Sequence, residues 1–150
     1  MNQEGIMKRR MVTAIVLCII AMIACLVFIG LYIDESNRVQ ETFRSQYYTS
    51  LQHVSDDVTS YLESEGDKDM RYTRLVSDMN TASSYAFLID NFTDKQIIVN
   101  ELATCLLKYP EQMTGKLEDV KKAADDMAAG LDKGYDEAKE IVESINKKGN

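Results

Sequence analysis

The side chains that perform most enzyme and metal chemistry are sparse in this sequence. Its 150 residues contain one histidine, His53, and three cysteines. A di-iron bundle needs Glu-x-x-His pairs on two helices, and a zinc site needs several histidines or cysteines at short spacing. Neither set can be assembled here, and no glycine-rich phosphate loop or Gly-x-Ser-x-Gly elbow occurs. The sequence therefore predicts a protein without catalytic activity, metal or cofactor.

The histidine and the acidic clusters are expected to form solvated surface. His53 lies beside Val54 in a stretch rich in Ser, Thr and Gln, which favours a solvent-facing histidine over a pH sensor. Calcium sites need several oxygens that converge from a loop. The doublets Asp56–Asp57 and Asp125–Asp126 lack such a loop, and the acidic turn at 63–69 is too short for an EF-hand.

An uncharged apolar run over residues 11–33 is the strongest structural signal in the sequence. A bilayer core of ~30 Å needs about 20 apolar helical residues, so the run predicts a transmembrane helix. A cleaved signal peptide would have an apolar core of about 7–15 residues and then a small-x-small cleavage site, which this run lacks. Residues 22–25 weakly resemble a lipoprotein box, but the chain stays apolar after Cys25. Lipidation of Cys25 is therefore a minor alternative.

Charges on either side of the run predict its orientation. Basic residues beside a span stay in the cytoplasm, and the acidic Asp34 and Glu35 follow the run. Residues 1–10 are expected to form a short cytoplasmic tail. Residues 34–150 are then the extracytoplasmic domain of a signal-anchored, single-pass protein of the cell membrane. The basic residues that determine this topology are Lys8, Arg9 and Arg10.

Small residues recur along one face of the predicted span. Such residues let two transmembrane backbones approach closely, so the face is a candidate contact for a second copy of the chain or for a membrane-protein partner. The alternative is that this spacing arose by chance and has no role in contacts, because small residues are frequent in transmembrane helices. The four positions, at steps of 4-3-4, are Ala14, Cys18, Ala21 and Cys25.

Net charge excludes nucleic acid as a partner of the external region. The chain has a formal charge of −7, and residues 1–33 contribute +2, so the remainder has −9. Nucleic acid requires a basic surface that neutralises phosphates.

Cys105 is the one cysteine outside the run, between Leu102 and Leu106. We expect it to be a buried small hydrophobe rather than an interchain disulfide partner.

After the run, apolar residues recur at helical steps of three and four, which predicts an all-α fold. No breaker follows the span, so its helix is expected to continue to about Glu63. Gly66 marks a turn, and a second helix should run from about Asp69 to Ile89. The segment Thr93–Gln96 has the form of a capping box that begins a third helix. Pro110 should end this helix and open the next.

The region after Pro110 has the most regular pattern. From Met113 to Ile145 its apolar residues step 4-3-4-3, a heptad seam typical of coiled-coil packing. One straight helix would extend about 57 Å against about 24 Å for the third helix. We therefore expect a kink or break at Gly130 or Gly134, and looser packing of the last ~15 residues. Four helices with short connections predict an up-down bundle.

Two further patterns have structural explanations. Asn91 begins an Asn-Phe-Thr sequon at a predicted exposed turn, and its glycosylation depends on a source that the sequence does not reveal. The tyrosines outside the span are expected to fill the core edge rather than line a pocket. They are Tyr47, Tyr48, Tyr61, Tyr72, Tyr85, Tyr109 and Tyr135.

These patterns predict a membrane-anchored helical scaffold or protein-interaction module. The alternative is an extracytoplasmic ligand-sensing bundle that acts through a partner protein. It resembles bacterial chemoreceptors in architecture only, because this sequence contains no second span and no signalling domain. A continuous rod like that of phage lysis spanins is less favoured, since Gly66, Thr93 and Pro110 interrupt it.

Overall fold

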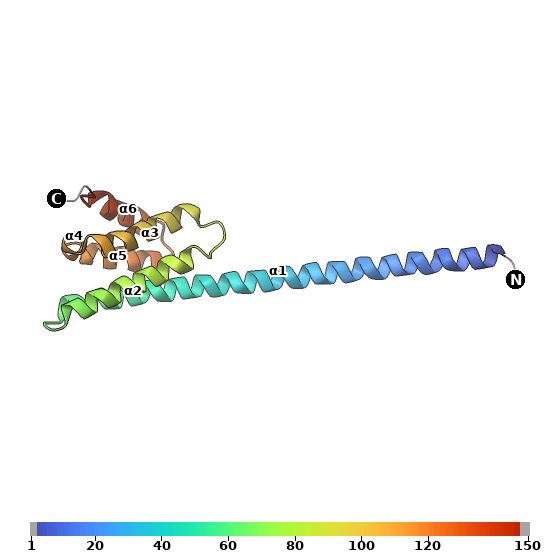
Figure 1. The fold of residues 1–150 in the computed structure, drawn as a ribbon, viewed down its shortest axis with the longest axis horizontal. Helices are drawn as coiled ribbons and strands as arrows, with labels where there is room; N and C mark the ends of the chain where they lie inside the picture. Colours follow the sequence, from blue (N-terminus) through green and yellow to red (C-terminus); the bar gives the residue numbers. More distant parts are fainter. Residues whose placement is uncertain (1–2, 148–150) are drawn as a thin grey trace. The chain divides into compact units, whose positions relative to one another are not determined.

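The protein is all-α, as predicted (Figure 1). The computed structural model describes residues 3–147, and these residues form six helices and no strand. The described chain divides between Val39 and Gln40 into two compact units. The helices are α1 (Gln3–Glu63), α2 (Lys68–Ala86), α3 (Thr93–Lys108), α4 (Pro110–Thr114), α5 (Leu117–Ala128) and α6 (Lys133–Ser144).

The first unit consists of the N-terminal part of α1. Every side chain from residue 11 to residue 33 is exposed. The most apolar 18-residue window of α1 has a mean hydropathy of 3.2, and none of it is buried. By length and composition, α1 is therefore a candidate membrane span. The predicted end of this helix near Glu63 is confirmed.

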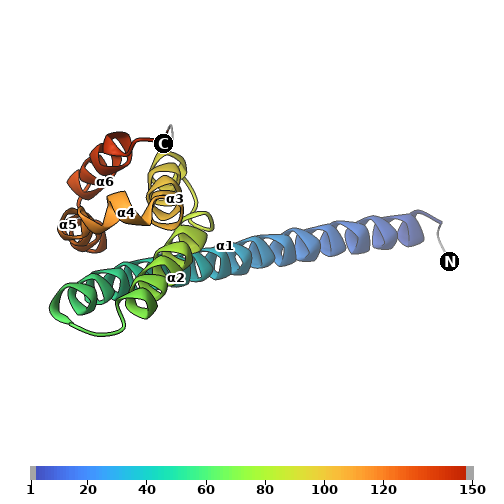
Figure 2. The ribbon, with the colours of Figure 1, turned by 60° about the vertical axis from the view of Figure 1, so that its left-hand side comes forward.

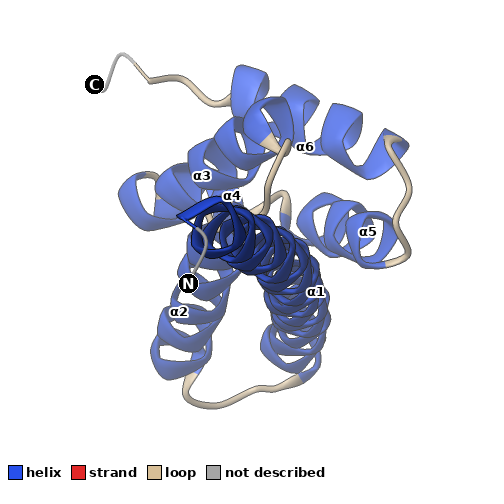
Figure 3. Ribbon diagram, turned by 90° about the vertical axis from the view of Figure 1, so that its right-hand side faces the viewer, coloured by secondary structure: helices blue, strands red, loops and turns tan. Residues whose placement is uncertain are grey.

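The second unit begins at Gln40 and has its own apolar core. Helix α2 packs on α3, α3 packs on α6 and α4, and α5 packs on α6 (Figures 2 and 3). The C-terminal part of α1 contributes one apolar stripe to the core, with its members three or four residues apart. The fully buried members of this stripe are Tyr47, Leu51, Val54 and Val58.

The predicted fourth helix is three helices. Pro110 opens α4, as expected, but the heptad seam is interrupted at residues 115–116 and again at residues 129–132. Helix α5 ends in a Schellman motif. The Gly130 amide donates to the Met127 carbonyl at 3.0 Å, and the Leu131 amide donates to Asp126 at 2.9 Å. Gly130 has φ +76°, which glycine adopts without steric cost. The predicted break at Gly130 is therefore confirmed.

The expectation of looser packing over the last ~15 residues does not hold for helix α6, and residues 148–150 of that segment lie outside the described residues. Helix α6 buries Ala138 completely and leaves Val142 only 1% exposed. The reversal at Gly130 lays α6 back against α5 and α3, so its apolar stripe is covered. Gly134 lies where α6 meets α5, because a Cβ there would be 2.7 Å from the Met127 amide nitrogen. Gly134 is thus a close crossing of two helices and not a break in the chain's helical structure.

Two local predictions around the α2–α3 connection were wrong. Helix α2 ends at Ala86 rather than near Ile89. Thr93 is the first residue of α3, Phe92 is its N-cap, and no side chain caps it. The Gln96 amide instead donates to the Phe92 carbonyl at 2.8 Å. The Phe92 ring packs edge-on to Tyr47, at 5.4 Å between centroids. We infer that this ring contact, rather than a threonine hydroxyl, positions the start of α3.

Candidate functional site

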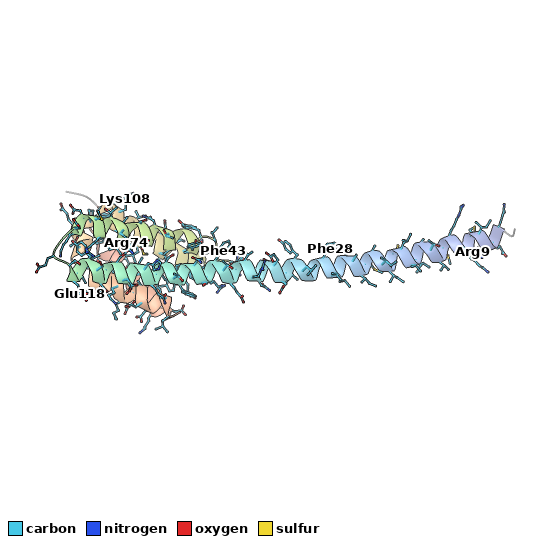
Figure 4. The ribbon with its side chains drawn as sticks, turned by 90° about the horizontal axis from the view of Figure 1, so that it is seen from below. Arg9, Phe28, Phe43, Arg74, Lys108 and Glu118 are labelled. Atoms are coloured by element: carbon cyan, nitrogen blue, oxygen red, sulfur yellow. The ribbon has the colours of Figure 1, made fainter. Side chains whose placement is uncertain are left out.

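A row of polar side chains crosses the contact between α1 and α2. On each helix the two members are four residues apart, so they share one face. Asp57 is only 5% exposed, and its Oδ1 lies 3.0 Å from Arg74 Nε, which reaches it from α2 (Figure 4). We call the group the polar seam. It comprises His53 and Asp57 on α1 with Arg74 and Asp78 on α2.

The polar seam has an unusual protonation equilibrium. Burial and the neighbouring Asp78 carboxyl raise the pKa of Asp57 to about 6, against the opposing charges of Arg74 and His53. The second carboxylate oxygen of Asp57 is buried and accepts no hydrogen bond. Two close carboxyls disfavour the doubly charged state, because like charges repel more strongly away from water. The seam can therefore take up one proton near pH 6.

Asp57 was wrongly predicted to be solvated with Asp56. Asp56 and His53 are exposed, so the prediction for those two residues is confirmed. At 100° per residue Asp57 lies about 80° from Tyr47, at the edge of the buried stripe of α1. That angle was available from the sequence. The sequence did not show that α2 packs over this edge of α1. Burial of Asp57 depends on that packing.

Arg71 extends the same contact toward the α1–α2 turn. Its guanidinium donates to the carbonyl of Gly66 at 3.2 Å and to the hydroxyl of Ser60. Asp67, the N-cap of α2, has φ 51°, so the turn reverses the chain through a left-handed residue. Arg71 therefore ties this turn to both helices.

A buried tyrosine pair connects α1 with α6. The hydroxyls of Tyr47 and Tyr135 are 3.0 Å apart, and the Tyr47 hydroxyl also lies 3.9 Å from Met127 Sδ. Burial raises the pKa of Tyr47 and raises that of Tyr135 to about 12. Both phenols are therefore protonated at neutral pH, and one donates to the other. Lys95 Nζ lies over the Tyr135 ring, 4.9 Å from its centroid. The predicted core use of these two tyrosines is confirmed.

Replacing Tyr47 with phenylalanine should lower the free energy of unfolding by about 1 kcal/mol, because Tyr135 loses a buried hydrogen-bond partner. Urea unfolding of the full chain in detergent micelles, followed by circular dichroism, would measure the change. Tyr135→Phe should have a similar effect. The double variant should lose less unfolding free energy than the sum of the losses in the two single variants, because replacing both tyrosines leaves no hydroxyl without a partner. Strict additivity would contradict a direct bond between the hydroxyls.

The residues singled out in the apolar run all lie exposed on α1. At 100° per residue the four small residues fall within about 60° of one another, so the helix does place them on one face. Lys8, Arg9 and Arg10 are exposed near the start of α1, and Asn91 is exposed with φ 58°. Cys105 is 2% exposed, which confirms its predicted burial. The four small residues are Ala14, Cys18, Ala21 and Cys25.

One depression of about 310 Å³ lies between α5 and α6. Charged side chains line it, and Lys122 Nζ pairs with Glu137 Oε1 at 2.6 Å. Within residues 3–147 no three His, Cys, Asp or Glu side chains group as a metal site. No protein-family model matches the chain, and no curated protein and no solved structure matches it.

Proposed function

We propose that this chain is a membrane-anchored helical interaction module without catalytic activity. The observation that supports it most is the contrast between the two units. Residues 11–33 expose a continuous apolar surface, whereas the unit from Gln40 onward buries most of its apolar residues in a core. Large exposed apolar surfaces mark contacts with membranes or proteins. Lipid around residues 11–33 would cover this surface completely.

The proposed topology places the N-terminus in the cytoplasm and the helical unit outside the cell membrane. Lys8, Arg9 and Arg10 before the run support this orientation, and Asp34 and Glu35 after it agree with it. Folded on the outer side as an up-down helical bundle, the second unit would be held near the bilayer for contact with a partner.

The proposed partner contact within the membrane is the face with Ala14, Cys18, Ala21 and Cys25. A second copy of the chain or another membrane helix could approach closely along this face. Cys18 and Cys25 are exposed free thiols on the face, whereas Cys105 is buried. The native cysteines can therefore report contact between copies.

Oxidative crosslinking in intact membranes tests this function. We expect a covalent dimer from the unaltered chain, and Ala21→Leu should reduce it several-fold by separating the backbones. Gly30→Leu is the matched control, because Gly30 lies about 150° around the helix from the centre of the face. Crosslinking to a different protein that Ala21→Leu also abolishes would support the partner form of the proposal. A dimer unchanged by Ala21→Leu would contradict the contact face, and release of the chain by alkaline carbonate would contradict the anchor.

A second candidate is an extracytoplasmic sensor that acts through a partner, and the polar seam favours it. The seam joins α2 to the helix that includes the apolar run, and Asp57 in it has a pKa of about 6. Protonation would remove the repulsion between Asp57 and Asp78 and weaken the attraction of Arg74. Crosslinking yield that is constant from pH 5 to pH 7.5 would count against a sensor of protons.

A further inference from the structure

We infer that one end of the helical unit docks on the outer surface of the bilayer that α1 is proposed to cross. The contact consists of three apolar side chains in two turns, Phe87 and Leu88 after α2 and Leu131 after α5. We call them the apolar tip. The occupant of this surface is the headgroup region of zwitterionic lipid. This inference rests on the proposed membrane anchoring and adds a second lipid contact to it.

Large apolar side chains are exposed in both turns. Phe87 is 54% exposed, Leu88 is 48% exposed and Leu131 is 41% exposed. The early end of α2 makes this possible, because the chain leaves the helix at Ala86. Ile89 then turns inward and is 4% exposed, while the two residues before it face solvent. Of the three apolar residues in this turn, Ile89 therefore packs into the core, and Phe87 and Leu88 are exposed to solvent.

The two turns belong to the same end of the unit. Lys95 in the first turn of α3 pairs with Asp132 of the α5–α6 turn, with 2.7 Å between Nζ and Oδ1. Phe92 lies edge-on to Tyr135 at the start of α6, with ring centroids 5.8 Å apart. These two contacts hold the α2–α3 turn, which contains Phe87 and Leu88, and the α5–α6 turn, which contains Leu131, at one end of the unit.

Gln40 fixes the α2–α3 turn to the point where the helical unit begins. Its side-chain nitrogen donates to the Leu88 carbonyl at 3.2 Å, and its side-chain oxygen accepts from the Asp90 amide at 2.9 Å. Gln40 is seven positions after Ile33, where the apolar run ends. Seven residues cover about 10 Å as a helix and at most about 25 Å when extended. The apolar tip is therefore tethered within reach of the headgroup layer.

The charge around the apolar tip indicates which lipid surface it fits. Asp90 and Asp94 are exposed close to Phe87 and Leu88, and Lys95 is already paired with Asp132. Acidic residues oppose binding to anionic lipid, because the surface potential of such a membrane is negative. Phosphatidylcholine has no net charge, and an aromatic ring is well suited to its interface. The geometry and charge together point to zwitterionic lipid.

Tryptophan quenching by brominated lipid tests the inference, because the chain contains no tryptophan of its own. Three single variants of the full chain are reconstituted in phosphatidylcholine vesicles with acyl-chain bromine. Phe87→Trp reports the apolar tip, and Phe28→Trp reports the proposed span. Met70→Trp is the matched control, because Met70 is 72% exposed near the start of α2.

We expect Phe87→Trp to be quenched at least two-fold more than Met70→Trp and to emit at shorter wavelength. If Phe28→Trp is quenched but Phe87→Trp and Met70→Trp are quenched equally weakly, the docking of the apolar tip is overturned and the membrane anchor stands. Absence of quenching at 28 would overturn the proposed anchoring itself. Leu88→Asp should reduce quenching of Phe87→Trp several-fold if the tip inserts, whereas an unchanged signal would contradict insertion.

Discussion

Replacing Gly134 with alanine is expected to lower the free energy of unfolding of the helical unit by about 3 kcal/mol. A Cβ at this position would lie 2.7 Å from the Met127 amide nitrogen and 2.9 Å from the Ala123 carbonyl oxygen. Both atoms are backbone atoms of α5, so relief requires that α5 and α6 move apart. Helix propensity favours alanine by about 1 kcal/mol, which the clash must exceed. Urea unfolding of the full chain in micelles, followed at 222 nm, measures the loss.

Gly115 provides the matched control for this variant. It lies between α4 and α5, and a Cβ there would meet nothing closer than the Gln112 carbonyl oxygen at 3.9 Å. Its φ of −75° is open to any residue. Gly115→Ala should therefore be neutral or stabilise the fold by up to about 1 kcal/mol, because it restricts the unfolded chain. Equal unfolding free energies for the two alanine variants would contradict the close crossing of α5 and α6.

Replacing Asp57 with asparagine should raise the free energy of unfolding at pH 7.5 by about 2 kcal/mol. Folding raises the pKa of Asp57 to about 6, above the value of about 3.9 in an unfolded chain. The folded state therefore binds the proton more tightly, and stability falls as pH rises from about 4 to about 6. Above pH 6 the buried charge remains as a cost of up to about 3 kcal/mol. Asparagine keeps the shape and removes this charge.

The pH profile distinguishes this explanation from a general effect of lost charge. The unaltered chain should become more stable as pH falls from 7 toward 4.5, and Asp57→Asn should remove most of that slope. Asp56→Asn is the control, because Asp56 is the exposed neighbour and its replacement should leave both stability and slope nearly unchanged. A less stable Asp57→Asn variant at pH 7.5 would mean that the ion pair with Arg74 outweighs the burial of the carboxylate.

The amino-acid sequence determined the local features of the fold. The end of α1 at Glu63, the turn at Gly66 and the start of α4 at Pro110 follow from turn composition and from proline's missing amide. The apolar run and the buried stripe of α1 follow from periodicity alone. These features depend on residues within one or two turns of each other, so no distant segment is needed to predict them.

Tertiary structure decided the features that depend on which helix covers which. A heptad seam from Met113 to Ile145 fits one long helix or several short ones packed together. The packing of α5 on α6 and of α6 on α3 selected the second arrangement. Phe92 became the N-cap of α3 because its ring had Tyr47 to pack against. Asp57 became a proton-binding group because α2 covered the edge of a stripe that looks solvated in isolation. Periodicity within one helix indicates the centre of its buried face, but burial at the edge of that face depends on which other helix packs over it.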